Sequence, residues 1–212
     1  MQFNEAQIQA IQHNTGPCMV IAGPGSGKTT VLTHRVRYLI ERYGVNPSDI
    51  LVITFTKAAA EQMKLKFKGL SEGRNSAVTF GTFHAVFFTI LKAAYNYSAH
   101  CIIKPQIQHE FVKDQMCRLE LEYDDENEAV AGVLSEISCV KGEDVNIDEY
   151  ESRCIPPQSF RIMYRAYDDM LVRKHLIDFD DMIVQCRELL MQREDYRRAW
   201  QNKYKYLSLI HI

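Results

Sequence analysis

The sequence predicts an α/β protein in which a parallel sheet with crossover helices is interrupted by a helical insertion. Three compact apolar runs, each followed by an amphipathic helical pattern, occupy the first 95 residues. This alternation is typical of a parallel sheet covered by helices. From residue 98 to 176 strand-like runs nearly vanish and helical patterns follow one another, which indicates the insertion.

The elements of the first half follow from local patterns. A short helix is expected over residues 3–13, with Asn4 as N-cap and Gln7 three positions later. The runs CMVIAG, ILVITF and AVTFGTFH read as buried parallel strands; they cover residues 18–23, 50–55 and 77–84. Helical spacing of apolar residues follows each run; these helices are expected over 32–43, 57–70 and 85–95.

In the second half, helices are expected around residues 106–120, 125–139 and 158–174. A further amphipathic helix over 178–191 would be capped by Asp178 or Asp180. Its apolar stripe is predicted to be Phe179, Met182, Ile183, Cys186 and Leu190. YKYLSLI, residues 204–210, resembles the start of another strand. We therefore expect an α/β domain in residues 1–97, an insertion in 98–176, and a return to the α/β domain in 177–212.

Composition indicates a soluble globular protein, with 46% hydrophobic and 25% charged residues. No apolar run is long enough to span a membrane, and the N-terminus lacks the pattern of a signal peptide. Six cysteines are scattered without a C-x-x-C pair. Reduced thiols in the core, and a cytoplasmic location, are the resulting expectations.

The net charge of −2 hides an uneven distribution. Residues 1–100 hold ten Lys and Arg against five Asp and Glu, and residues 181–212 hold six against four. Residues 101–180 hold nine against eighteen. A polyanion would therefore meet the flanks rather than the middle, although a solvated acidic helical surface explains the middle by itself.

The turn after the first apolar run matches G-x-x-x-x-G-K-[ST], except that alanine takes the first place. Glycines let several backbone N–H groups face a β-phosphate, and the next helix adds the positive end of its dipole. Lys28 is expected to neutralise the β- and γ-oxygens, and the Thr29 hydroxyl to bind Mg²⁺; these two are the candidate catalytic residues. This turn, called the phosphate loop below, consists of Ala22, Gly23, Pro24, Gly25, Ser26, Gly27, Lys28 and Thr29. It predicts ATP or GTP binding.

The strings FNEAQIQAI, AGPGSGKTTVLTHR, ILVITFTKAAAEQM, GTFHAVFFTIL and DFDDMI occur in this order. Together they resemble the UvrD/Rep-type superfamily 1 DNA helicases, from Phe3 to about Tyr206, densely in the first 95 residues and sparsely in the insertion. The resemblance implies a RecA-like P-loop NTPase fold with a helical insertion subdomain. It also implies ATP and Mg²⁺ as cofactors, single-stranded DNA as partner, and translocation in the 3′→5′ sense.

The resemblance assigns adenine recognition to Gln7, whose amide can pair with the adenine edge. The alternative is a glutamine that only helps Asn4 cap its helix. Thr30 is included among the nucleotide contacts, although relatives carry arginine there, which puts one purine-side contact in question.

The resemblance places DNA contacts at the ends of two predicted strands, namely at Thr54, Phe55, Thr56, Thr82, Phe83 and His84. An aromatic ring there can stack on a base, and hydroxyls can meet phosphates. Burial of Phe55 in the strand core, and a purely structural His84, are the alternatives. Asp180 and Asp181 are expected to help position the insertion rather than to bind Mg²⁺.

The family's next element is a strand ending in Asp-Glu, whereas this chain continues as LSLIHI. We hypothesise that the chain is the N-terminal part of a longer helicase, and leave open whether residues 207–212 are native. Alone, it is expected to be a monomer that binds nucleotide but does not translocate.

Two other functions stay open at this point. A P-loop kinase for a small molecule could use YRAYDDMLVRKH, residues 164–175, as an arginine-bearing lid. A non-catalytic ATP-responsive module could regulate a partner through the acidic insertion.

Overall fold

The computed structural model describes residues 2–71 and 77–210, and the chain divides into two compact units. Unit 1 comprises Met1–Val86 and Arg193–Ile212, and unit 2 comprises Phe87–Gln192. Whether residues 207–212 are native was left open, and of these, residues 211–212 lie outside the described part of the chain. The domain boundaries expected at residues 97 and 177 stay a prediction.

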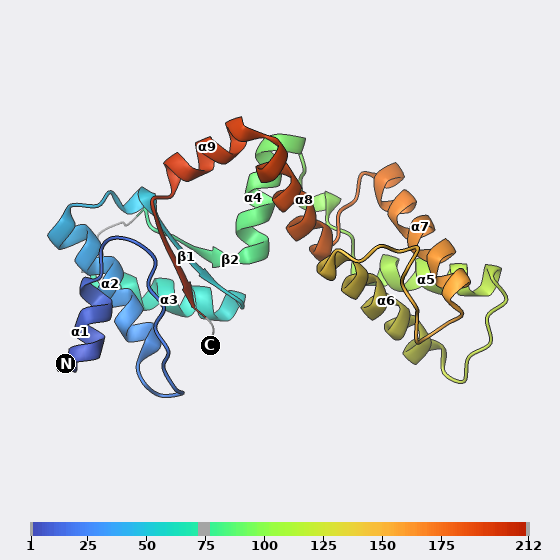
Figure 1. Ribbon diagram of the computed structural model, residues 1–212, viewed down its shortest axis with the longest axis horizontal. Helices are drawn as coiled ribbons and strands as arrows, with labels where there is room; N and C mark the ends of the chain where they lie inside the picture. Colours follow the sequence, from blue (N-terminus) through green and yellow to red (C-terminus); the bar gives the residue numbers. More distant parts are fainter. Residues whose placement is uncertain (1, 72–76, 211–212) are drawn as a thin grey trace. The chain divides into compact units, whose positions relative to one another are not determined.

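Unit 1 contains a three-stranded parallel sheet with the order β2-β1-β3 (Figure 1). The strands are β1 (Ile50–Thr54), β2 (Thr79–Thr82) and β3 (Tyr206–Ile210). All of β1 is buried, as expected for the central strand of a parallel sheet whose faces are covered by helices. The α/β fold with a parallel sheet is thereby confirmed, including the strand expected near the end of the chain.

The helices of unit 1 are α1 (Glu5–Gln12), α2 (Lys28–Tyr43), α3 (Lys57–Leu70) and α9 (Glu194–Lys203). A short 3-10 helix, Pro47–Asp49, precedes β1. The helix α4 (Phe83–Tyr95) begins in unit 1 and continues into unit 2. Apolar faces of α2 and α3 pack with the sheet in one core: Val36, Leu39, Ile50, Val52, Met63, Phe67, Val78 and Ile210.

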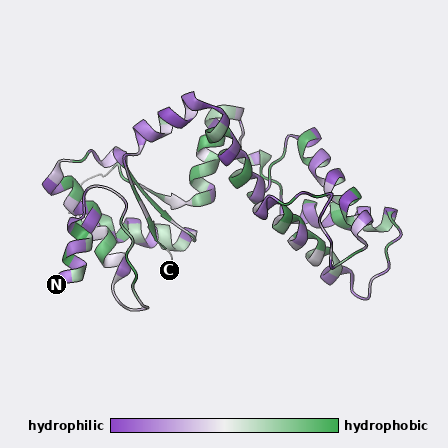
Figure 2. Cartoon of the chain, viewed as in Figure 1, coloured by the Kyte–Doolittle hydropathy of each residue, from purple (hydrophilic) through white to green (hydrophobic). Residues whose placement is uncertain are grey.

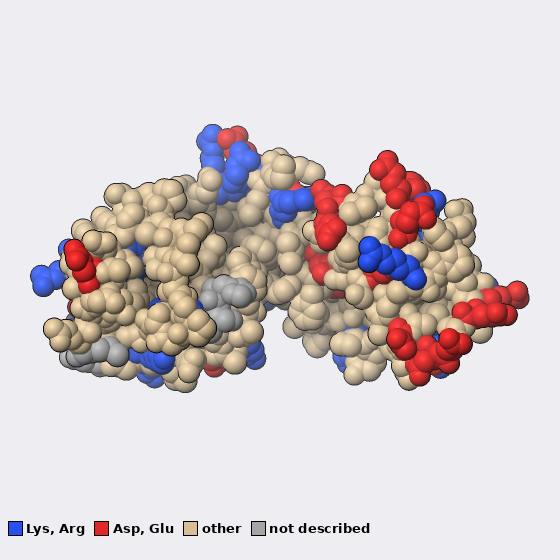
Figure 3. Space-filling model, turned by 60° about the horizontal axis from the view of Figure 1, so that its bottom comes forward, with Lys and Arg blue, Asp and Glu red and all other residues tan. Residues whose placement is uncertain are grey.

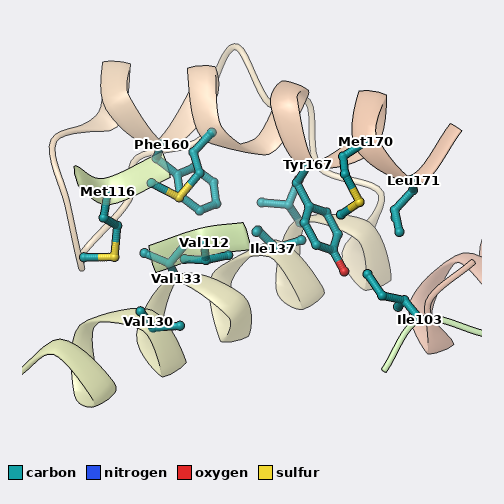
Figure 4. Close-up of a cluster of buried hydrophobic side chains, with 12 residues drawn as sticks. Ile103, Val112, Met116, Val130, Val133, Ile137, Phe160, Tyr167, Met170 and Leu171 are labelled. Carbon is teal, nitrogen blue, oxygen red and sulfur yellow. The ribbon is translucent and has the colours of Figure 1, made fainter. Parts of the chain in front are cut away.

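Unit 2 is helical in its described residues, as the insertion pattern predicted. Its helices are α5 (Pro105–Arg118), α6 (Glu126–Glu143), α7 (Pro157–Lys174) and α8 (Phe179–Gln192), with a short 3-10 helix at Ala99–Cys101. The first three pack around a core of their own, in which Phe160 and Tyr167 are fully buried (Figure 4). Asp and Glu side chains gather on the surface of this unit (Figure 3).

A buried cation ties the helices of unit 2 together. The Nζ of Lys141 on α6 lies 3.0 Å from an Asp178 carboxylate oxygen, 2.8 Å from Asp181 and 3.0 Å from Asp168. Only 4% of the Lys141 side chain is exposed. Burial alone would lower the pKa of Lys141, but the three carboxylates outweigh it and raise that pKa. Asp178 also accepts the backbone N–H of Asp181 at 2.7 Å, which confirms it as a cap of α8.

The strand predicted over residues 18–23 is wrong. These residues form neither helix nor strand, and the side chains of Met19, Val20 and Ile21 are 86%, 59% and 91% exposed. An apolar run indicates burial, but a strand also needs a partner in register. Here the carbonyl oxygens of Ala22 and Gly23 accept hydrogen bonds from Lys28 instead of from a neighbouring strand.

The predicted apolar stripe of α8 is also corrected. On α8 the buried residues are Met182, Cys186 and Leu189, whereas Phe179 and Ile183 are 55% and 43% exposed. The helix therefore turns a narrower stripe to the core than its sequence suggested.

The cysteines were expected in the core, yet only Cys186 is buried. Burial raises the pKa of this thiol to about 11. All six cysteines are unpaired. Within residues 2–71 and 77–210, no helix combines the length and apolar character needed to cross a membrane.

Candidate functional site

The phosphate loop leads directly into the N-terminus of α2. Gly25 and Gly27 have φ angles of 74° and 82°, a region that side-chain-bearing residues rarely adopt. Gly27 is the N-cap of α2 and supplies no side-chain cap, and the first turn of the helix carries no acidic residue. The first N–H groups of α2 and its positive dipole end are thus directed at the loop, a favourable place for an anion.

Two side chains of the loop bond to its own carbonyl oxygens. The Nζ of Lys28 donates to Ala22 at 3.2 Å and to Gly23 at 3.1 Å, and the Ser26 hydroxyl donates to Gly23 at 2.7 Å. An ammonium group that lies against neutral carbonyls gains more from a phosphate oxygen, because hydrogen bonds between charged partners are the stronger ones. Pro24 is exposed.

The first turn of α2 also places the two threonines. Thr29 and Thr30 follow Lys28 in the helix, and the hydroxyl of Thr33 donates to both of their carbonyl oxygens at 3.0 Å. The side chains of Thr29 and Thr30 are half-buried at this end of the helix.

Gln7 lies beside the phosphate loop. Its side-chain Nε2 donates to the Ser26 carbonyl at 3.1 Å, and its Oε1 accepts the backbone N–H of Asn4 at 3.1 Å. The Asn4 side-chain oxygen accepts the backbone N–H of Gln7 at 2.9 Å, which completes a capping box. The structure therefore joins Gln7 to the loop and also gives it the structural role that was the alternative to adenine recognition.

Sequence reasoning missed Arg35 as a residue that supports this region. Its guanidinium donates to the carbonyl oxygens of Ala10 and His13, which fixes the end of α1 and the segment after it against α2. Burial lowers the pKa of the Arg35 guanidinium from its usual value. In the sequence Arg35 is one of three arginines in this helical segment, with Arg37 and Arg42, and nothing in the pattern reveals its partners.

The predicted DNA-contact strings lie next to each other because β1 and β2 are parallel and in register. Thr54 pairs with Thr82 at the carboxyl ends of the two strands. Phe55 is 61% exposed, so its burial in the strand core is excluded. Its ring meets that of Phe83 edge-on, with centroids 5.4 Å apart. The two phenylalanines form an aromatic pair at the edge of the sheet where ligands of open α/β sheets are found.

The hydroxyls of this edge differ in what they can reach. Thr54 is buried and donates to the Thr56 carbonyl at 2.9 Å, so its role is to shape the turn. Thr56 and Thr82 accept backbone N–H groups at 3.2 and 3.3 Å and so cap α3 and the start of α4. His84 is half-buried in the first turn of α4.

The residues of the phosphate loop suit a nucleotide phosphate better than they suit a metal ion. An uncapped helix N-terminus, an adjacent lysine and open space on the side-chain side of Gly23 and Gly25 suit a phosphate chain. Among the described residues, no group of three or more His, Cys, Asp or Glu side chains could hold a metal ion. Ser26 and Thr29 carry hydroxyls in the phosphate loop, and that of Thr29 stays the predicted Mg²⁺ ligand.

Comparison with known proteins decides the family. Residues 3–209 match the family model of the UvrD/REP helicase N-terminal domain. The chain belongs to the UvrD/REP helicase family. It is 34% identical over 215 residues to ATP-dependent DNA helicase Rep of Escherichia coli K12, with 98% of this chain and 31% of Rep aligned.

Two further relatives give the same result. The putative ATP-dependent DNA helicase YjcD of Bacillus subtilis 168 is 31% identical, and the alignment covers 98% of this chain and 28% of YjcD. ATP-dependent DNA helicase PcrA of Staphylococcus epidermidis RP62A is 29% identical, with 98% and 29% covered. The chain thus spans about a third of the length of the curated relatives that it matches.

Proposed function

We propose that the chain is the N-terminal part of an ATP-dependent 3′→5′ DNA helicase, an enzyme that hydrolyses ATP and moves along DNA. The chain binds ATP with Mg²⁺ at the phosphate loop and contacts single-stranded DNA at the ends of β1 and β2. The observation that carries the proposal is the uncapped N-terminus of α2 with Lys28 and Gln7 beside it. We also propose that the chain is monomeric and lies in the cytoplasm.

At the nucleotide, each group has a distinct task. Backbone N–H groups of residues 25–29 bind the phosphate oxygens, and Lys28 exchanges its two carbonyl partners for the β- and γ-phosphates. The Thr29 hydroxyl holds Mg²⁺, which neutralises charge on the phosphate chain when bound. Gln7 forms hydrogen bonds to the adenine edge, and Thr30 is a further contact on the purine side. Ala22, Gly23, Pro24 and Ser26 shape the loop.

At the DNA, the aromatic pair of Phe55 and Phe83 offers faces and edges on which bases stack. Thr56, Thr82 and His84 lie at or just after the carboxyl ends of β1 and β2, where they would meet the sugar–phosphate backbone. Thr54 stabilises the turn between β1 and α3, because its hydroxyl donates a hydrogen bond to the Thr56 carbonyl. Both sites belong to unit 1. The helix α2, which follows the phosphate loop, packs against the sheet strand β1 that ends at Thr54.

A nucleotide-binding titration with and without an oligonucleotide tests the proposal. Lys28→Ala should lower the affinity for Mg·ATP at least about tenfold, because a charge-assisted contact contributes about 1.5–3 kcal/mol. Lys57→Ala is the matched control, since Lys57 also opens a helix in unit 1 but lies outside the loop. Equal affinities of wild type and Lys28→Ala would show that the loop does not bind the triphosphate.

The kinase alternative loses its lid in the structure. Residues 164–175 lie mostly in α7, where Tyr167, Met170 and Leu171 are buried in the core of unit 2. Arg165 pairs with Asp148. A segment whose side chains fill a core is not free to close over a substrate. The only observation that supports the regulatory-module alternative is the acidic surface of unit 2 among the described residues.

A further inference from the structure

Helix α9 carries a stripe in which cations and aromatic rings alternate. Its members recur at helical spacing: Arg193, Tyr196, Arg197, Trp200, Lys203 and Tyr204. Positions three and four residues apart lie on the same face of a helix. Sequence reasoning did not identify this helix or its stripe, although the strings YRRAW and NKYKY contain it.

The rings and cations of the stripe are in contact. The guanidinium of Arg193 lies 5.0 Å from the ring centre of Tyr196. The Lys203 ammonium lies 4.5 Å from the ring of Trp200 and 5.1 Å from that of Tyr204, and these two rings stack with centroids 6.0 Å apart. Cation–π contacts of this kind hold the side chains in an ordered surface.

No residue of α9 is fully buried, and Tyr196, Arg197 and Trp200 are half-buried. Figure 2 draws it almost entirely in hydrophilic colours. Residues 193–205 contain five Lys and Arg against two acidic residues. The acidic residues Glu194 and Asp195 pair with arginines, yet the side chains of Arg197 and Arg198 remain 41% and 72% exposed.

We propose that the α9 stripe is a second contact surface for single-stranded nucleic acid, separate from the strand-end site. The cations of the stripe and the exposed Arg198 next to Arg197 meet the phosphates, and Trp200 with its neighbouring rings stacks on a base. The charge of residues 193–205 complements a polyanion, and aromatic faces interleaved with cations are the surface that sequence-tolerant binding of single strands uses. This inference rests on the proposed function, because it adds a surface to the same DNA interaction.

The chain reports on this surface directly, because Trp200 is its only tryptophan. Oligo(dT) added to the full chain should quench Trp200 fluorescence in a saturable way, with weaker binding at higher salt. Poly-glutamate, which carries charge without bases, should leave the emission unchanged. Oligo(dT) binding, seen by anisotropy of a labelled strand, with unchanged Trp200 emission would overturn the proposal. Equal quenching by poly-glutamate would overturn it in favour of an acidic protein partner.

A charge-matched pair of variants removes the ambiguity of a single fluorescence signal. Arg197→Gln/Arg198→Gln should reduce the slope of log affinity against log salt by about 1.4, at about 0.7 per phosphate of a single strand. Lys113→Gln/Arg118→Gln in unit 2 removes the same charge from two exposed, paired cations and should leave the slope unchanged. Equal slopes for the two double variants would overturn the proposal.

Phe55→Ala separates failure of this inference from failure of the proposed function. Weaker oligo(dT) binding by Phe55→Ala together with a normal slope for Arg197→Gln/Arg198→Gln would refute the α9 surface alone. A reduced slope for that double variant with no effect of Phe55→Ala would support α9 and refute the strand-end site. A wild-type chain that does not bind oligo(dT) at low salt would refute both.

Discussion

Replacing Lys141 by methionine removes the cation from the centre of unit 2 while keeping most of the side-chain volume. Asp178 and Asp181, 4% and 16% exposed, then face each other without a counter-charge. The third partner, Asp168, is 43% exposed and can turn to solvent. The expected damage therefore comes from the two buried carboxylates.

Breaking a buried ion pair from one side costs about 3–5 kcal/mol, since the remaining charge keeps its desolvation penalty. That is a large part of the total free energy of unfolding of a domain, about 5–15 kcal/mol. Tyr167 also donates to Asp178 at 3.2 Å and receives a bond from Gln108, so the loss extends to a connected network.

Urea unfolding followed by circular dichroism measures the effect. The Lys141→Met midpoint should fall by at least about 1 M, at a slope of about 1–3 kcal/mol/M. Lys113→Met is the matched control, because the Lys113–Glu126 pair is exposed to solvent and should contribute little to stability. Midpoints that fall equally little in both variants would refute the reasoning that the buried cluster holds unit 2 together.

Two further predictions concern pH and a helix cap. Burial and the neighbouring Asp178 raise the pKa of Asp181 to about 6, although Lys141 opposes them. The folded chain then binds this proton more tightly than the unfolded one, so the contribution is present below about pH 4 and lost as pH rises through 6. Between pH 7 and 5 the wild type should gain about 1 kcal/mol more than Asp181→Asn in parallel urea titrations, and equal gains would count against the raised pKa. Thr56→Ala should destabilise unit 1 by about 1 kcal/mol through loss of the α3 cap, whereas Thr56→Ser should not; thermal unfolding of both variants distinguishes a cap from a passive position.

Much of the fold was predictable because its signals are local. The capping box of Asn4 and Gln7 and the glycines of the phosphate loop act within a few residues. The parallel sheet was predicted, whereas the register that pairs Thr54 with Thr82 is seen only in the structure. The helical insertion was visible because its periodicity differs from that of strands.

The remainder depends on partners that a sequence does not reveal. Whether residues 18–23 join the sheet depends on a neighbour, not on their own apolar character, and in the structure these residues are exposed. The bonds from Lys141 to Asp178 and Asp181 span 37 and 40 residues, and no spacing rule predicts them. The α9 stripe was readable in principle, since its i, i+3 and i+4 spacing is local, but only the structure shows that no residue of the helix is buried.

A crystal structure of the chain with bound Mg·ADP would test whether the loop around Gly25 and Thr29 is a phosphate site. The phosphates should lie against the backbone N–H groups of residues 25–29, and Lys28 should have left the carbonyl oxygens of Ala22 and Gly23. An empty loop with ADP bound elsewhere on the chain would contradict the nucleotide site and every function derived from it.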